Sequence, residues 1–236
     1  MTKRAVAAAL VAVFAVTAVA AVVAAIAGRG GDDGDVAAKG STTAPAALTD
    51  TGRELVDRLA SARRRTLHLA YRGTLPGAQQ AGTMAVELWW KGDRVRQTIA
   101  VEAADVHQES ASYVLPSGNL LCQKSDGTEW ACQRAASGAT AKPTALLDAL
   151  VAQLAGKKVT TSKVRVGDTE ADCYTVDAVA GNMLCLRADD VPVKVTVSGA
   201  ELVVTTVSTE VDDGDFTPPA EPSEAPIRPT TPTSGG

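Results

Sequence analysis

The sequence has few of the residues on which most enzymes and nucleic-acid-binding proteins depend. Aromatic residues make up only 3% of the 236 residues, and there are two histidines, His68 and His107. Acidic residues outnumber basic ones, 27 to 23, which gives a net charge of −4. Because nucleic-acid binding needs clustered Lys and Arg against phosphate, this balance argues against a nucleic-acid partner.

Sequence motifs that carry catalysis are also missing. There is no G-x-S-x-G, H-E-x-x-H, Walker A or G-x-G-x-x-G pattern. The two histidines are expected to face solvent, so the chain offers little general-base capacity. The acidic run Asp212–Asp215 lacks the rest of an EF-hand loop, and a plain acidic turn is favoured over a calcium site. We therefore expect a protein that is not an enzyme and that has no metal or cofactor.

One long apolar run stands near the start of the sequence. Residues 5–27 contain no charge, proline or glycine, and a helix of about 1.5 Å per residue over this length crosses the roughly 30 Å hydrocarbon core. Lys3 and Arg4 precede it, which places residues 1–4 in the cytoplasm and the rest of the chain outside. We expect an uncleaved single-pass anchor in the cell membrane. A signal peptide cleaved after Ala27 stays open, although its apolar core is usually shorter.

Segments of linker-like composition flank a single expected domain. Residues 28–47 are rich in Gly, Asp, Ala and Thr, which is typical of a flexible linker. Six of the eleven prolines lie from Pro218 onward, so residues 220–236 are predicted to be a disordered tail. Between them, residues 48–219 form a domain of about 170 residues, which is long enough to bury a core.

The domain is expected to open with a helix and to continue mainly as strands. Residues 51–54 have the form of a capping box, apolar residues follow at helical spacing, and Arg63–Arg65 ends the helix. Contact of this Arg run with anionic lipid headgroups is the less favoured alternative. A second helix is expected over residues 143–155. Strands are expected at 67–72, 84–90, 95–101, 107–114, 119–124, 129–134, 159–166, 171–179, 183–187, 193–198 and 201–211. Since short connections imply antiparallel neighbours, the prediction is an α+β fold with one curved antiparallel sheet and its helices on one face.

Four cysteines lie in the part of the chain expected to be exported. Cys122 and Cys132 flank a tight-turn signal at Asp126-Gly127, and Cys173 and Cys185 flank a second turn signal in the same way. Of the three possible pairings we expect these two local disulfides, because an exported chain meets an oxidising milieu. Free buried thiols are the alternative. Zinc is disfavoured, since the cysteines are too far apart and no histidine is near.

The order of these features resembles the LolA/LolB/LppX superfamily of bacterial lipoprotein carriers and lipid-binding envelope proteins, of actinobacterial type in composition. The resemblance covers about residues 48–219. It rests on the opening helix with Leu55 and Leu59, the strand Val86–Trp90 followed by Lys91–Arg96, the interposed helix, Cys173-Tyr174 with Cys185-Leu186, and Phe216–Pro219. It implies a half-open barrel whose helices, on the concave face, close an apolar cavity for acyl chains. The chain has no lipobox cysteine, and a fixed anchor suits local lipid handling or sensing better than shuttling.

The resemblance and the strand alternation together give candidate cavity residues. Adjacent strand residues face opposite ways, so Trp90 is assigned inward and Trp89 to the outer face or beneath a helix. The candidates for lipid binding are Leu69, Tyr71, Val86, Leu88, Trp90, Ile99 and Tyr113. The same side chains could simply fill a core. We expect a membrane-anchored extracytoplasmic protein that binds a lipid or acylated ligand. The alternative is a regulatory or scaffold ectodomain that contacts another envelope protein.

Overall fold

The structure of this protein is a computed structural model that describes part of the chain. The described residues are 47–74, 82–103, 106–125, 128–134, 154–176, 182–197 and 200–223. In this part of the chain, one α-helix and one 3-10 helix accompany twelve strands. The described part of the chain is therefore mostly β, as the alternating sequence predicts. The helix expected over residues 143–155 lies outside the described residues except for its last two positions.

The strands follow the predicted segments to within a few residues. The first six are β1 (Leu67–Thr74), β2 (Thr83–Lys91), β3 (Arg94–Ala103), β4 (Val106–Leu115), β5 (Gly118–Ser125) and β6 (Ala131–Arg134). The next five are β7 (Val159–Val166), β8 (Thr169–Val176), β9 (Met183–Arg187), β10 (Pro192–Val197) and β11 (Ala200–Ser208). A two-residue strand, β12 (Pro222–Ser223), comes last. We call β1–β6 the N-terminal meander and β7–β11 the C-terminal meander.

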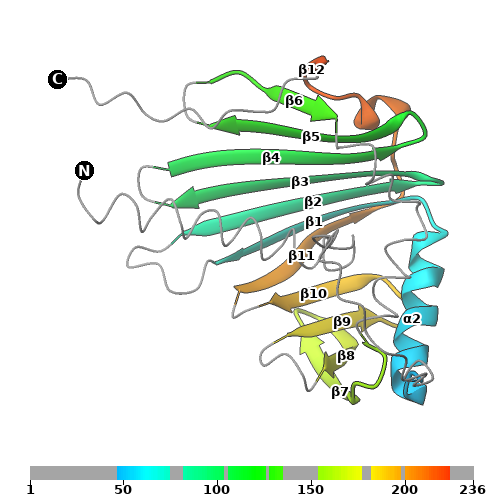
Figure 1. The fold of residues 1–236 in the computed structure, drawn as a ribbon. Coiled ribbons are helices and arrows are strands. Elements are labelled where there is room, and N and C mark those ends of the chain that lie inside the picture. The colour runs from blue at the N-terminus through cyan, green and yellow to red at the C-terminus, as the bar shows by residue number, and fades with distance from the viewer. Residues whose placement is uncertain are drawn as a thin grey trace, which may run out of the picture.

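All twelve strands form one open, curved sheet (Figure 1). Its order is β12-β6-β5-β4-β3-β2-β1-β11-β10-β9-β8-β7. Neighbouring strands are antiparallel, apart from the short parallel pair of β12 with β6. β1 pairs with β2 on one side and β11 on the other, so this strand joins the two meanders. The predicted single antiparallel sheet is confirmed.

The helix α2 (Asp50–Arg63) begins two residues earlier than the expected capping box. Its N-cap is Thr49, whose Oγ1 accepts a hydrogen bond from the Gly52 backbone N–H at 3.1 Å. The capping box predicted for residues 51–54 is therefore wrong. Either threonine can cap a helix, but capping at Thr49 places Asp50 in the first turn, where the helix dipole favours a carboxylate.

A buried apolar cluster fastens α2 to the C-terminal meander. Leu55 of α2 packs with Val159, Tyr174 and Leu186, all at most 5% exposed, and Leu59 adds to the edge of the cluster. Burying a side chain of this size contributes about 1.5–3 kcal/mol. A buried apolar cluster therefore lies between α2 and this end of the sheet. Figure 1 shows α2 beside the strands of the C-terminal meander.

Strand pairing sorts the side chains of the sheet into two faces. The face that α2 covers, here called the helix face, carries Leu69, Leu88, Trp90 and Leu186. The opposite face carries His68, Trp89, Cys122 and Cys173. Both faces are apolar over much of their area, because buried clusters lie on each.

Both predicted disulfides are confirmed, and no described cysteine is free. Cys122 bonds to Cys132 across β5 and β6, and Cys173 bonds to Cys185 across β8 and β9. Each pair occupies directly opposed positions of its hairpin. The turn symmetry of the sequence was thus sufficient to choose the pairing. Each meander carries one cross-link, and both cross-links are buried.

The expected membrane anchor is not among the described residues. Residues 5–27, the linker up to residue 46 and the tail from residue 224 lie outside them. Within the described ranges, no helix combines the length and the apolar character needed to span a membrane.

Candidate functional site

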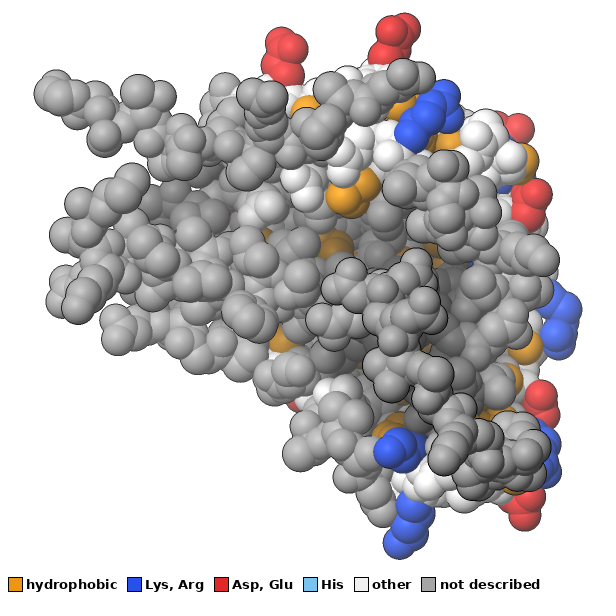
Figure 2. All heavy atoms as spheres, viewed as in Figure 1, with side chains coloured by type: hydrophobic (Ala, Val, Ile, Leu, Met, Phe, Trp, Pro, Cys, Tyr) orange, Lys and Arg blue, Asp and Glu red, His pale blue; other side chains and the backbone are white. Residues whose placement is uncertain are grey.

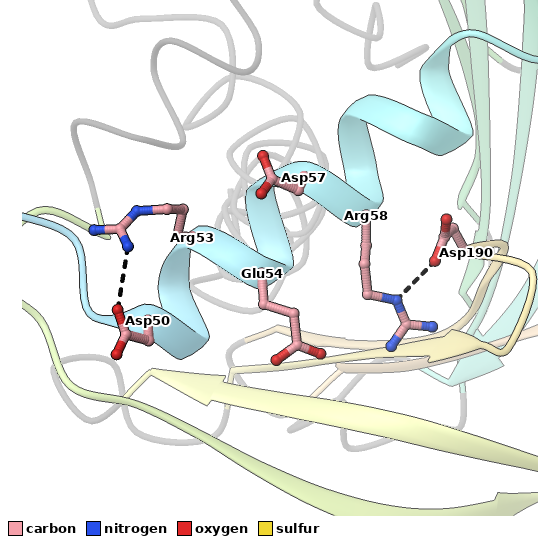
Figure 3. Close-up of a pocket in the computed structure, with 6 residues that line it drawn as sticks. All are labelled: Asp50, Arg53, Glu54, Asp57, Arg58 and Asp190. Carbon is pink, nitrogen blue, oxygen red and sulfur yellow. Dashed lines mark hydrogen bonds and ion pairs between the residues drawn. The ribbon is translucent and has the colours of Figure 1, made fainter.

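A charged cleft opens beside α2 (Figure 3). Its volume is about 480 Å³, and it is lined by Asp50, Arg53, Glu54, Asp57, Arg58 and Asp190. Five of these residues come from α2, and Asp190 comes from the turn after β9. In the view of Figure 2, the charged side chains of the described residues lie mainly along the margin of the molecule.

Arg58 uses its donors on internal partners. Its Nε donates to Asp190 at 2.7 Å, its Nη1 to Asp172 at 2.9 Å, and its Nη2 to the Arg187 carbonyl at 2.6 Å. Burial alone would lower the pKa of Arg58, but hydrogen bonds to Asp190, Tyr174 and Asp172 outweigh it and raise the pKa. The hydrogen bond from Arg58 in turn lowers the pKa of Asp172.

This network fastens α2 to the sheet. Tyr174 donates from its hydroxyl to Glu54 at 2.7 Å and accepts from Arg58 Nη1 at 3.0 Å. The described residues contain no group of His, Cys, Asp or Glu side chains that could hold a metal ion. Sequence reasoning missed the network, because its partners are 114 to 132 residues away from Arg58.

Six of the seven predicted cavity residues meet on the helix face. Leu69, Tyr71, Val86 and Ile99 are at most 5% exposed, and Leu88 and Trp90 are partly buried against them. We call these six residues the apolar strip. The Tyr71 hydroxyl donates to the Pro192 carbonyl at 2.9 Å, and burial raises the pKa of Tyr71. The strip therefore belongs to one apolar cluster across β1, β2 and β3, and within the strip only Leu88 and Trp90 are partly exposed.

Tyr113 does not belong to this surface. Ile99 pairs with Ser110, whereas Tyr113 pairs with Arg96 and lies on the opposite face of the sheet. There it packs with Leu120 and the Cys122–Cys132 disulfide. The prediction that Tyr113 lines the same cavity as the other six residues is therefore wrong. Alternation separates the two faces of β4, but only the pairing with β3 determines which of them lies on the helix face.

Polar side chains interrupt the helix face beside the apolar strip. Gln97 and Ser110 are buried, with 4% and 6% exposure, and Gln97 pairs with Leu88 on one side and Ser112 on the other. No residue in the described part of the chain accepts a hydrogen bond from Gln97 Nε2. The alternation of β3 places Gln97 on the same face as Val95 and Ile99, so the sequence alone could have indicated a polar side chain within this apolar face.

The opposite face of the N-terminal meander is closed by the 3-10 helix η1 (Asp213–Phe216). Phe216 packs with Trp89 and Val211, and Asp213 accepts hydrogen bonds from Lys91 at 2.7 Å and Arg94 at 2.8 Å. The acidic run Asp212–Asp215 therefore forms a turn that is held by ion pairs, and a turn was the favoured prediction for this segment. Trp89 lies beneath this short helix.

Both histidines were predicted to face solvent, but His68 is largely covered. The His68 ring stacks on Trp89 with 4.6 Å between centroids, and its side chain is only 22% exposed. Its Nε2 lies 3.1 Å from Glu87 Oε2. His107 is more open, with 41% of its side chain exposed, and pairs with Glu109. The expectation for His68 is wrong, because an imidazole beside Trp89 on one face gains stacking contact.

Comparison with known proteins yields distant structural likenesses. No family model matches the sequence, and no curated protein matches it. The structure is similar to MucB in its complex with MucA(peri), at 18% identity and a TM-score of 0.44, with 76% of this chain and 62% of that chain covered. It is also similar to PNGF-II in two crystal forms, at 11% and 10% identity and a TM-score of 0.31 in both. Those two matches cover 64% and 67% of this chain but 29% and 31% of PNGF-II. The chain thus spans less than two thirds of each neighbour, and these likenesses are too distant to show a family.

Proposed function

We propose that this protein is a membrane-anchored, extracytoplasmic, non-enzymatic member of the LolA/LolB/LppX-like proteins that binds the acyl chain of a lipid or lipid-modified ligand. The acyl chain would lie on the helix face of the N-terminal meander, against the apolar strip. The apolar anchor predicted at residues 5–27 would hold this domain at the membrane surface.

The apolar strip is the observation that supports the proposal best. Six side chains chosen from the sequence as cavity candidates are contiguous on β1, β2 and β3. Leu88 and Trp90 remain only partly buried, whereas Leu186 under α2 is fully buried. A site for an acyl chain needs such an apolar surface with a few polar groups beside it.

The two disulfides support the proposed location. Each closes a local hairpin, and both are buried in the sheet. Structural disulfides persist in oxidising compartments and are rare in the cytosol. An extracytoplasmic position of the described domain agrees with this chemistry.

Native mass spectrometry of the full-length protein, purified from its own host envelope in amphipol, tests the proposal. We expect a stoichiometric acyl-bearing adduct that organic extraction releases. The variant Leu88→Asp should lose the adduct, because a carboxylate on the apolar strip opposes acyl-chain burial. The matched variant Thr98→Asp, which places the same charge on the opposite face of β3, should keep it.

An absence of lipid from the wild-type protein, together with no uptake of added lipids, would contradict the proposal. That result would favour the alternative function, a regulatory or scaffold ectodomain that acts through protein contacts. Circular dichroism of both variants and intact disulfides would show that loss of the adduct is not loss of the fold.

A further inference from the structure

Two buried hydrogen-bond donors on the helix face have no acceptor among the described residues. Gln97 is 4% exposed, and its Nε2 forms no hydrogen bond. Arg63, in the last turn of α2, holds its Nη1 out of contact with solvent, and this nitrogen also has no hydrogen-bond partner. A buried polar group without a partner is destabilising, and such groups in a folded protein call for an explanation.

The two donors approach the apolar strip from different elements. The Arg63 guanidinium lies over the Trp90 ring, 5.7 Å from its centroid. Trp90 pairs with Val95 and Leu88 pairs with Gln97, so Gln97 is the diagonal neighbour of Trp90 on the same face. Diagonal neighbours in an antiparallel pair lie about 7–8 Å apart, within reach of long side chains. Arg63 and Gln97 therefore border one end of the apolar strip.

Arg63 also lacks a counter-ion. Among the described residues no carboxylate pairs with it, and burial without a compensating charge lowers the pKa of its guanidinium. Arg58, one turn and a half earlier on the same helix, makes ion pairs with Asp172 and Asp190. Since an arginine stays charged in proteins, the Arg63 environment is complementary to an anion.

We propose that the ligand of the apolar strip is an acyl lipid with an anionic head, which Arg63 and Gln97 bind together. Arg63 Nη1 and Gln97 Nε2 donate to a carboxylate or phosphate oxygen, and the chain runs from Trp90 along Leu88 and Val86. This inference rests on the proposed acyl-chain binding and adds the chemistry of the head. A planar guanidinium suits either oxyanion.

Photoreactive probes test the proposal on the full-length, delipidated protein in amphipol. Three probes share one acyl chain: a diazirine palmitate, the corresponding lysophosphatidic acid, and the neutral alcohol. Mass spectrometry maps the cross-links, and titration gives the half-saturating concentration. We expect the anionic probes to label β2 and β3 and to bind more tightly than the alcohol. The tighter of the two identifies the head group as carboxylate or phosphate.

The variants separate head recognition from packing. Arg63→Met should weaken anionic binding roughly ten- to hundredfold and leave the alcohol unchanged, and Arg63→Lys should recover part of the loss. Gln97→Leu should weaken anionic binding by a smaller factor. Arg64→Met, which removes an exposed charge from the next position, is the matched control and should change nothing.

Two results would overturn the inference while leaving acyl binding in place. One is equal affinity of the wild-type protein for the alcohol and the anionic probes. The other is an equal loss for all probes in Arg63→Met, which would make Arg63 a packing residue over Trp90. Absence of labelling on β2 and β3 by every probe would instead contradict the proposed function itself.

Discussion

The two meanders of the sheet are covered in different ways. On the C-terminal meander, α2 closes the helix face with an apolar cluster around Leu186 and ties it down through Arg58. On the N-terminal meander, η1 closes the opposite face through Phe216. The helix face of that meander keeps Leu88 and Trp90 partly exposed, beside the unpaired amide of Gln97.

Apolar side chains are buried at both ends of the helix face, so the two ends differ mainly in their polar groups. Under α2, apolar groups are buried and the polar groups of Arg58 and Tyr174 have partners. Beside the apolar strip, two buried donors lack partners. Arg96 Nε and Thr196 Oγ1 also lack partners elsewhere in the sheet. The donors of Arg63 and Gln97 differ from these in lying beside the partly buried Trp90, and we therefore assign the binding surface to this end.

Leucine truncation should give the largest contrast between the meanders. Leu186→Ala should lower the free energy of unfolding by about 2–5 kcal/mol, because it leaves a cavity in a filled core. Leu88→Ala should cost about 1 kcal/mol or less, because its side chain already borders solvent. Urea unfolding followed by circular dichroism measures both. Equal losses would mean that the helix face of the N-terminal meander is also a filled core.

Removal of either disulfide should affect the two meanders alike. The linked cysteines are 10 residues apart in β5–β6 and 12 apart in β8–β9, so the cross-links constrain the unfolded chain to a similar degree. Replacing either pair with alanine should lower the free energy of unfolding by about 3 kcal/mol. Thermal unfolding of the two double variants provides the comparison. A much larger loss from one pair would assign an additional packing role to that hairpin.

The hydrogen bonds of Arg58 should contribute less to the free energy of unfolding than the apolar cluster or the disulfides, and they should act on the C-terminal meander. Arg58→Met should lower the free energy of unfolding by about 2 kcal/mol, because it leaves Asp190 without its donor and Asp172 with only its longer ion pair to Lys163. Arg53→Met is the matched control on the same helix, since its pair with Asp50 is exposed and contributes little. Equal effects of the two variants would show that the network does not fasten α2.

Acid should weaken the C-terminal meander slightly more than the N-terminal one. A hydrogen bond from Arg187 lowers the pKa of Asp189 to about 2. Because this folded-state pKa is depressed, the associated stability is present above the ordinary aspartate pKa of about 4 and is lost as the pH falls toward 2.

Urea unfolding between pH 5 and pH 2 checks this dependence. Arg187→Met should flatten it, while Arg94→Met should change it little because its partner Asp213 is fully exposed to solvent. A wild-type protein that is equally stable at pH 5 and pH 2 would contradict the assignment.

Local patterns in the sequence were sufficient to predict most of the strands, the antiparallel arrangement of the sheet and the two disulfides. Alternation located β1 to β5 because each strand has one apolar face, and turn symmetry paired Cys122 with Cys132. Alternation failed at Tyr113, because the face of β4 is set by its register with β3. It also did not reveal the pairing of β1 with β11, which joins residues 127 to 140 positions apart.

The candidate site was predictable in its apolar part and not in its polar part. The residues of the apolar strip occupy alternate positions in β1, β2 and β3, so the alternation of the sequence could identify them. The position of Arg63 over Trp90 depends on how α2 lies across the sheet. No local pattern encodes that contact. The Arg63–Arg65 run was interpreted as a helix end, with contact to anionic lipid headgroups as the less favoured alternative.

Fluorescence quenching at two neighbouring tryptophans tests the central claim most directly. Trp89 and Trp90 are adjacent in β2 but lie on opposite faces, Trp89 beneath Phe216 and Trp90 on the apolar strip. Two variants of the full-length protein would keep one of them each, with the other and Trp130 changed to phenylalanine. A fatty acid brominated on its chain should quench Trp90 in a saturable manner and leave Trp89 unchanged. Equal quenching of both tryptophans, or none of Trp90, would contradict a binding surface on the helix face of the N-terminal meander.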